Sequence, residues 1–206
     1  MPISYHLAYF NKKKTVPFDT KKGIENPELA YRVFVDYDSE QSFDDVLQSF
    51  CNDPKAGEVK QLVIGSWMGE DEYDKDSSEV VELLVENKDK LANLEALMIG
   101  DITYDENEIS WIEQSDVNPI IEAFSKLKHL QLRGGNSLSL GKIEHQNLEK
   151  IVIQSGGMPS HILHQLAKSS LPNLTHLELW LGSDNYGWNG DISDVQLLYS
   201  KELFPK

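Results

Sequence analysis

The stretch RGGNSLSLGK (133–142) contains residue types that cradle phosphate groups, namely glycines followed by a Gly-Lys pair. A phosphate-binding loop needs a glycine, four further residues, and then Gly-Lys followed by Ser or Thr. Counted back from Gly141 and Lys142, the first position is Asn136, and the residue after Lys142 is Ile143. No clear helix is expected after Lys142 either. We therefore interpret these glycines as a turn that needs positive φ angles, not as a nucleotide site.

Two acidic stretches resemble cation-binding loops in composition. A calcium loop alternates acidic ligands around a central glycine and ends on a glutamate. The run GEDEYDKDSSE (69–79) lacks the inner glycine, and GSDNYGWNGD (182–191) misses the spacing. We interpret the first as a solvated loop before a helix. The second contains Asp184, Asn185 and Asp191, and it is kept as a candidate loop for a small molecule or a metal ion because long loops often carry function.

Nucleophiles and metal ligands are few. The single cysteine, Cys51, ends an apolar helical stripe, so core packing is expected for it. His129 and His176 occupy equivalent positions two strands apart, which is about 10 Å and too far for a shared metal ion without another ligand. His161 and His164 lie on one predicted helix, but no acidic or cysteine ligand flanks them. We expect surface or capping roles for these histidines, and no catalytic residue, cofactor or metal centre.

A repeated pattern of apolar residues indicates the elements that position these side chains. Each copy has an apolar residue, two others, an apolar residue, one other and a further apolar residue. The triplets are Leu94/Leu97/Ile99, Leu127/Leu130/Leu132, Leu148/Ile151/Ile153 and Leu174/Leu177/Leu179, with fainter copies at Val59/Leu62/Ile64 and Val33/Val35. The last two apolar residues alternate with other residues, so a short strand is expected in each copy.

Apolar residues at helical spacing fill the chain between these strands. The candidate helices are SFDDVLQSFC (42–51), SSEVVELLVENKDKL (77–91), VNPIIEAFSKL (117–127), MPSHILHQLAKSSL (158–171) and DISDVQLLYSKELF (191–204). The connection between Leu130 and Ile151 spans only 21 residues, which leaves no room for a long helix. Strands that alternate with helices predict an α/β fold with a parallel sheet and helices against one face.

The copies LANLEALMIG, FSKLKHLQLRG, HQNLEKIVIQ and SLPNLTHLELW resemble bacterial cytoplasmic leucine-rich repeat proteins of the ribonuclease-inhibitor-like superfamily. The resemblance covers about residues 58–206 and, more loosely, the strand-helix unit at 31–51. It implies a leucine-rich repeat solenoid with the parallel sheet on the concave side, helices on the convex side, and no catalytic residues. Residues 1–57 would then be an N-terminal cap with a first degenerate unit, continuous with the repeats in one structural domain. Irregular repeat lengths and few cysteines depart from the vertebrate inhibitors, so ribonuclease binding is not carried over.

Residues between the inward leucines must face the open side of the sheet. They combine cations with apolar groups, a composition that favours protein contacts. The predicted partner-binding residues are Phe34, Met98, His129, Gln131, Arg133, Lys150, Val152, His176, Glu178 and Trp180. For Trp180, packing against the following loop at Tyr186 or Trp188 is an equal alternative.

Composition limits the class of partner. The net charge of −15 disfavours nucleic acid. No apolar run reaches the length of a membrane span, and the N-terminus lacks the order of a secretory signal. One cysteine fits a cytoplasmic protein. We expect a non-enzymatic scaffold that binds an unknown protein through its concave face. The alternatives are small-molecule or metal binding at loop 182–191 or the concave histidines, and a purely structural segment of a larger repeat protein.

The end of the chain, ELFPK, looks like the introduction of a further strand. We therefore expect a truncated array at its C-terminus. Its last strand, which carries Leu177 and Leu179, should be an unpaired edge open to edge-to-edge self-association.

Overall fold

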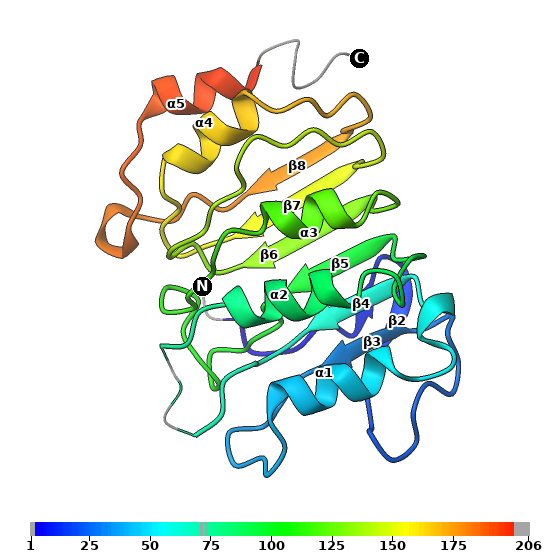
Figure 1. Ribbon diagram of the computed structural model, residues 1–206. Coiled ribbons are helices and arrows are strands. Elements are labelled where there is room, and N and C mark those ends of the chain that lie inside the picture. Colours follow the sequence, from blue (N-terminus) through cyan, green and yellow to red (C-terminus); the bar gives the residue numbers. More distant parts are fainter. Residues whose placement is uncertain (1–2, 71, 73, 200–206) are drawn as a thin grey trace.

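The computed structural model describes residues 3–70, 72 and 74–199. It is an α/β fold in which an eight-stranded sheet curls into a half-barrel and helices cover one face (Figure 1). The strands are β1 (Tyr9–Phe10), β2 (Lys13–Pro17), β3 (Ala30–Val33), β4 (Gln61–Ile64), β5 (Ala96–Ile99), β6 (His129–Arg133), β7 (Lys150–Gln154) and β8 (His176–Leu179). The α-helices are α1 (Phe43–Cys51), α2 (Ser78–Glu86), α3 (Asn118–Ala123), α4 (His161–Ala167) and α5 (Ile192–Gln196). Short 3-10 turns lie at Ala56–Glu58, Asp184–Tyr186 and Leu197–Tyr199.

Strand order in the sheet follows the order of the chain, β1 to β8. Only the β1–β2 pair is antiparallel, and every other neighbouring pair is parallel. The register places equivalent residues of the repeated triplets side by side, so that one row of the sheet runs Leu62, Leu97, Leu130, Ile151, Leu177. The predicted α/β class and the strands of the repeats are confirmed.

The helices lie where apolar residues recur at helical spacing. Helix α1 begins after Ser42, whose hydroxyl accepts a hydrogen bond from the N–H of Asp45, and it buries the predicted stripe Val46, Leu47 and Phe50. Helix α3 begins at Asn118, and Pro119 lies in its first turn, where a missing N–H is tolerated. The connection from β6 to β7 contains no helix, as its length predicts.

One core lies between the sheet and its helices. The inward rows of the strands are almost fully excluded from solvent, and the apolar faces of α1 to α4 pack against them. Each fully buried Leu or Ile contributes about 1.5–3 kcal/mol relative to an exposed one. Among the described residues, none of the helices has the length and apolar character needed to cross a bilayer.

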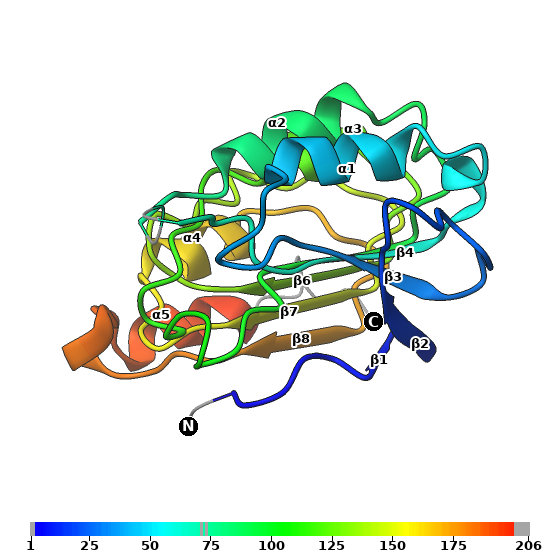
Figure 2. The same cartoon turned by 90° about the horizontal axis from the view of Figure 1, so that it is seen from below.

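The opposite face of the sheet is partly covered by an N-terminal segment, which we call the strap (residues 3–10). Figure 2 shows the strap crossing below the sheet, on the side away from the helices, before the chain enters β2. Phe10 and Leu7 of the strap pack against the outward side chains Val63, Ala96 and Met98. The sequence predicted neither β1 nor β2. The concave face, which was predicted to be open, is closed by the strap over β4 and β5.

A buried charge cluster holds the strap in place. The carboxylate of Asp101 is fully buried and accepts hydrogen bonds from the backbone N–H of Leu7 at 3.2 and 3.3 Å. The same carboxylate lies 3.3 Å from Nε of Arg32 and 3.4 Å from Nη1 of Arg133. Glu106 supplies a second countercharge, 3.2 Å from Nη2 of Arg32. Since an unpaired buried charge is costly, these four groups stabilise the strap only as a set.

At the other end of the sheet, β8 pairs with β7 and with no other strand among the described residues. Leu177 and Leu179 are half-buried, whereas their counterparts on the preceding strands are buried. The final turn packs on α4 and buries Leu198. Residues 203–206, expected to introduce a further strand, lie outside the described residues.

Candidate binding site

Five of the ten predicted partner-binding residues are buried, and a sixth, Phe34, is half-buried under another side chain. Met98 is covered by the strap, and His129 lies under Phe10 with ring centroids 4.9 Å apart. The buried members of the predicted set are Met98, His129, Gln131, Arg133 and Val152. Phe34 is half-buried because the guanidinium of Arg32 stacks on its ring at 3.9 Å. For the five buried residues, the prediction that they form part of an exposed surface is wrong.

Arg133 shows the physical reason most clearly. It is the last outward residue of β6, as predicted, but it is only 2% exposed. Its guanidinium donates to the carbonyl of Ile102 at 2.8 Å and to Oε1 of Gln154 at 3.0 Å, in addition to its ion pair with Asp101. The residue therefore fixes the loop after β5. Gly134 and Gly141 have φ angles of 107° and 59°, which confirms the predicted positive φ for two of the three glycines of this stretch, whereas Gly135 has no positive φ.

The four remaining members of the set lie together at the β7–β8 end of the concave face. Lys150 and Glu178 are half-buried, and His176 is exposed. Trp180 is 36% exposed, and its indole N–H donates to Glu178 at 2.9 Å. These residues form the part of the concave face that the strap leaves open.

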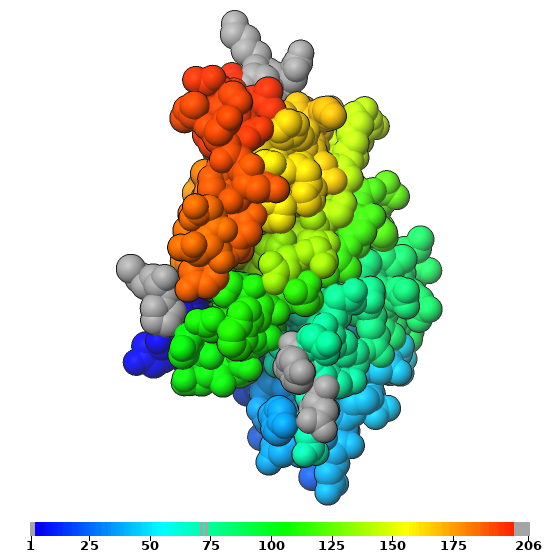
Figure 3. Space-filling view, turned by 90° about the vertical axis from the view of Figure 1, so that its left-hand side faces the viewer, coloured from blue at the N-terminus to red at the C-terminus, as the bar shows by residue number. Residues whose placement is uncertain are grey.

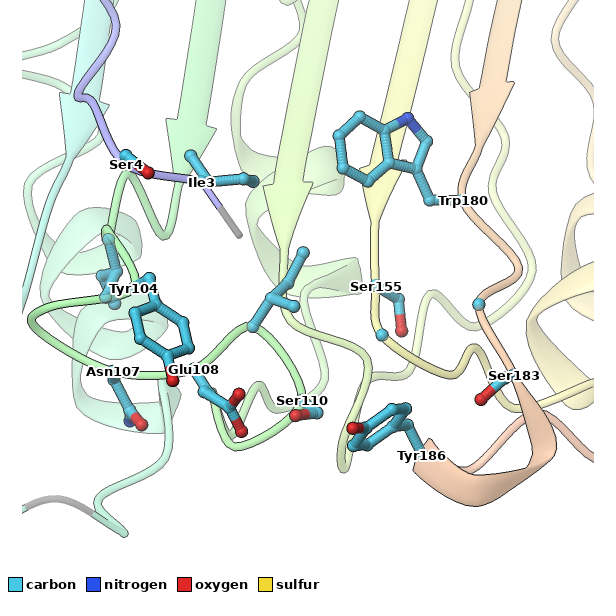
Figure 4. A pocket seen from close by; sticks show the side chains of 14 residues that line it. Ile3, Ser4, Tyr104, Asn107, Glu108, Ser110, Ser155, Trp180, Ser183 and Tyr186 are labelled. Carbon is cyan, nitrogen blue, oxygen red and sulfur yellow. The ribbon is translucent and has the colours of Figure 1, made fainter. Parts of the chain in front are cut away.

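Beside them lies a hollow of about 780 Å³ at the carboxyl ends of the strands, which we call the apolar hollow. It is lined by Ile3 and Ser4 of the strap, by the loop after β5 from Ile102 to Ser110, by Ser155 and Gly156 after β7, and by Trp180, Gly182, Ser183 and Tyr186 after β8. Figure 4 shows Tyr104, Trp180 and Tyr186 around this space, with the hydroxyl groups of Ser110 and Ser155 near its floor. Parallel strands end at one edge of the sheet, so loops distant in sequence meet there.

A second hollow of about 780 Å³ adjoins the first and shares Tyr104, Asn107 and Glu108 with it. We call it the acidic hollow, and the two together the edge groove. Its other lining residues are Asp74, Asp105, Glu106, Trp111, Glu113 and Asn136. Figure 3 looks at this edge of the molecule, where the loop after β5, the strap and the chain after β8 come together. Neither lining contains Lys, Arg or His.

The loop between β5 and α3 is held firmly enough to form a wall of the groove. Its Tyr104 N–H donates to the carbonyl of Ile3 at 2.8 Å. Glu106 accepts hydrogen bonds from the N–H and hydroxyl of Thr103 at 2.7 and 3.0 Å and also pairs with Arg32. The strap and the buried charge cluster therefore position this wall.

The loop at 182–191 borders the groove but shows no cation site. Asp191 caps α5 by accepting from the N–H of Ser193 at 2.6 Å, so its carboxylate is already engaged. Gly182, Ser183 and Tyr186 of the loop line the apolar hollow. In the part of the chain that the structure describes, no three His, Cys, Asp or Glu side chains are grouped to hold a metal ion.

Histidine and cysteine side chains have structural roles. His161 contacts the carbonyl of Leu138 at 2.9 Å, and His164 contacts the carboxylate of Asp194 at 2.6 Å. Burial raises the pKa of the Cys51 thiol to about 12, so the core role predicted for it is confirmed. Burial, and then the charges of Lys150 and His176, lower the pKa of His129 to about 4.

The wall of the edge groove that the loop after β5 forms was not predicted, because this loop carries no chemical motif. One signal was present: the spacing from Leu97 to Leu130 is 33 residues, longer than a repeat of about 20–29 residues. The excess forms the irregular chain from Gly100 to Val117, with exposed Tyr104 and Trp111. Long irregular loops in compact domains are often binding loops.

Comparison with known proteins shows a shared fold. No family model and no curated protein match the chain. The chain is similar to the crystal structure of a protein from Bacteroides fragilis that was a Northeast Structural Genomics Consortium target, with a TM-score of 0.75 and 37% sequence identity. The match covers 84% of this chain and 49% of the Bacteroides protein, so the chain spans about half the length of that protein.

Proposed function

We propose that this chain is a non-catalytic binding module of the leucine-rich repeat type, and that it binds a segment of a partner protein in the edge groove. The repeated triplets in one register support a solenoid of this class. The observation that carries the proposal is the edge groove itself: two adjoining hollows of about 780 Å³ each, walled by aromatic side chains. The apolar hollow, with its aromatic walls and a few polar groups, has the composition of a typical binding pocket.

The open part of the concave face extends the proposed site. Trp180 follows β8 in the row of outward residues and also lines the apolar hollow. A partner segment in the groove would therefore also contact Glu178 and His176. The proposed site therefore includes four contact residues that the sequence predicted, namely Lys150, His176, Glu178 and Trp180. It also includes Tyr104, Trp111 and Tyr186, each of which is more than half exposed.

Selection from a random peptide library displayed on phage tests the proposal. The full chain is immobilised, and recovered peptides are measured against wild type and the double variant Tyr104→Ala/Trp180→Ala. We expect groove-dependent peptides whose affinity falls by about tenfold or more, since aromatic anchors dominate such contacts. Tyr37→Ala is the matched control, because Tyr37 is 65% exposed and lines neither hollow. Peptides that bind wild type and the double variant equally would show that the groove is not the site.

A further inference from the structure

We infer that the occupant of the edge groove is a cationic segment of a partner protein, with an apolar side chain in the apolar hollow and a neighbouring Lys or Arg in the acidic hollow. This inference rests on the proposed function and adds the chemistry of the ligand. The two hollows share the wall formed by Tyr104, Asn107 and Glu108, so adjacent side chains of one extended segment can enter both.

Three carboxylates that line the acidic hollow have no cationic partner among the described residues. Within residues 3–70, 72 and 74–199, no ion pair forms to Asp105, Glu108 or Glu113. Glu106 differs, because Arg32 already neutralises it. A net charge of −15 over the chain adds a long-range attraction for cationic segments.

Glu113 is positioned in advance by neutral donors. Its Oε1 accepts from the amide of Asn136 at 3.0 Å, and its Oε2 accepts from the hydroxyl of Ser137 at 2.9 Å. These bonds orient the carboxylate without cancelling its charge, and a preorganised group loses less entropy when a ligand binds.

Aromatic rings complete the site for a cation. Trp111 is 64% exposed and Tyr104 is 52% exposed, and both line the acidic hollow beside these carboxylates. A guanidinium or ammonium group is stabilised both by an aromatic face and by a charge-assisted hydrogen bond to a carboxylate. A neutral or anionic segment would use the apolar hollow alone and would leave the carboxylates unpaired.

Two pools of fluorescent synthetic peptides test the inference on the full chain. Both pools carry degenerate Leu, Ile and Phe anchors, which are flanked by Lys and Arg in the basic pool and by Ser and Gln in the neutral pool. Fluorescence anisotropy should show that the basic pool binds about tenfold more tightly at low salt, and that this preference narrows as salt screens the charges. Glu108→Gln/Glu113→Gln should remove most of the preference.

Glu82→Gln/Glu86→Gln is the matched control, because it removes the same charge from exposed positions on α2. An equal loss in this control, or equal binding of the two pools, would overturn the inference. Absence of binding by the basic pool up to about 1 mM would also overturn it. A different result would contradict the proposed function itself: the affinities of both pools for the chain would be unchanged by Tyr104→Ala/Trp180→Ala.

Discussion

His129 should make the fold sensitive to acid. Its imidazole lies beneath Phe10 of the strap and is 6% exposed, and its Nε2 has no hydrogen-bond partner among the described residues. Burial, followed by the charges of Lys150 and His176, lowers its pKa from the ordinary value of 6.5 to about 4. The folded protein therefore keeps this side chain neutral at a pH where the unfolded chain protonates it.

The sign of the effect follows from proton uptake. Between pH 6.5 and about 4 the unfolded chain binds more protons at this residue than the folded protein does. The contribution of neutral His129 is therefore complete above pH 6.5 and is lost as the pH falls toward 4. At pH 5.5 this lowering of the pKa corresponds to a loss of about 1 kcal/mol in the free energy of unfolding, and the full loss at lower pH is about 3 kcal/mol.

Urea unfolding of wild type and His129→Gln at about pH 7.5 and about pH 5.5 measures this contribution. Other titrating groups are common to both proteins, so the difference between their pH dependences isolates His129. We expect the wild type to lose about 1 kcal/mol more than the variant. His176→Gln retains His129 and should keep most of the wild-type pH dependence. Equal losses in wild type and His129→Gln would refute the claim that a neutral imidazole is buried under the strap.

Two further predictions concern the strap and the turn beside it. Asp101→Ala leaves two buried guanidinium groups short of a countercharge and removes the acceptor for the strap, so urea unfolding should show a loss of about 3–5 kcal/mol; a loss below about 1 kcal/mol would contradict the ion-pair argument. Gly100→Ala places a Cβ 2.5 Å from the carbonyl oxygen of Arg133 at a φ of 94°, so thermal unfolding should show a marked destabilisation. Gly57→Ala meets its nearest atom at 3.5 Å and should behave as wild type within about 1 kcal/mol, and similar effects at both glycines would contradict the steric explanation.

The inward rows of the sheet were predictable because each inward residue is independently apolar. Leu97, Leu130 and Ile151 occupy one row, and their register follows from the repeat alone. The helices were predictable for the same reason, since their apolar stripes face the same core. The boundaries were less predictable: helices α2, α3 and α4 end four or five residues before the predicted segments do. Ser77 precedes α2, but its hydroxyl bonds to Gln114 instead of capping the helix.

The strap was not predicted because its contacts are non-local. Leu7 meets Asp101 across 94 residues of chain, and no local pattern specifies such a contact. A signal did exist in the outward residues. The outward residues Val63, Ala96 and Met98 of β4 and β5 are apolar, so another part of the chain can bury them. Such outward apolar residues were interpreted from the sequence as a surface for a partner protein instead.

The edge groove could be predicted only in part. Trp180 was identified from its row in the sheet, and the loop at 182–191 from its length and composition. The remaining wall is the loop after β5. Its position is fixed by the contacts of Arg133 with Ile102 and of Arg32 with Glu106, which belong to the buried charge cluster. Each of these charged residues, taken alone, looks like a surface group. The ion pairs and hydrogen bonds between them, which form the groove wall, therefore could not be predicted from the sequence.

The polarity of the outward rows explains why the open part of this face, and with it the proposed binding site, lies at one corner of the molecule. One row along the sheet begins with the apolar Val63 and Met98 and ends at Glu178, and the neighbouring row runs from Ala96 to the polar His129, Lys150 and His176. The strap covers the apolar beginning of the first row, because those side chains gain most from leaving water. It leaves the polar end open, beside the carboxyl edge where Trp180 and Tyr104 line the groove. The same segment that closes the concave face thus forms one wall of the edge groove, through Ile3 and Ser4, so a variant that releases the strap should lose groove binding even if every aromatic residue of the groove is retained.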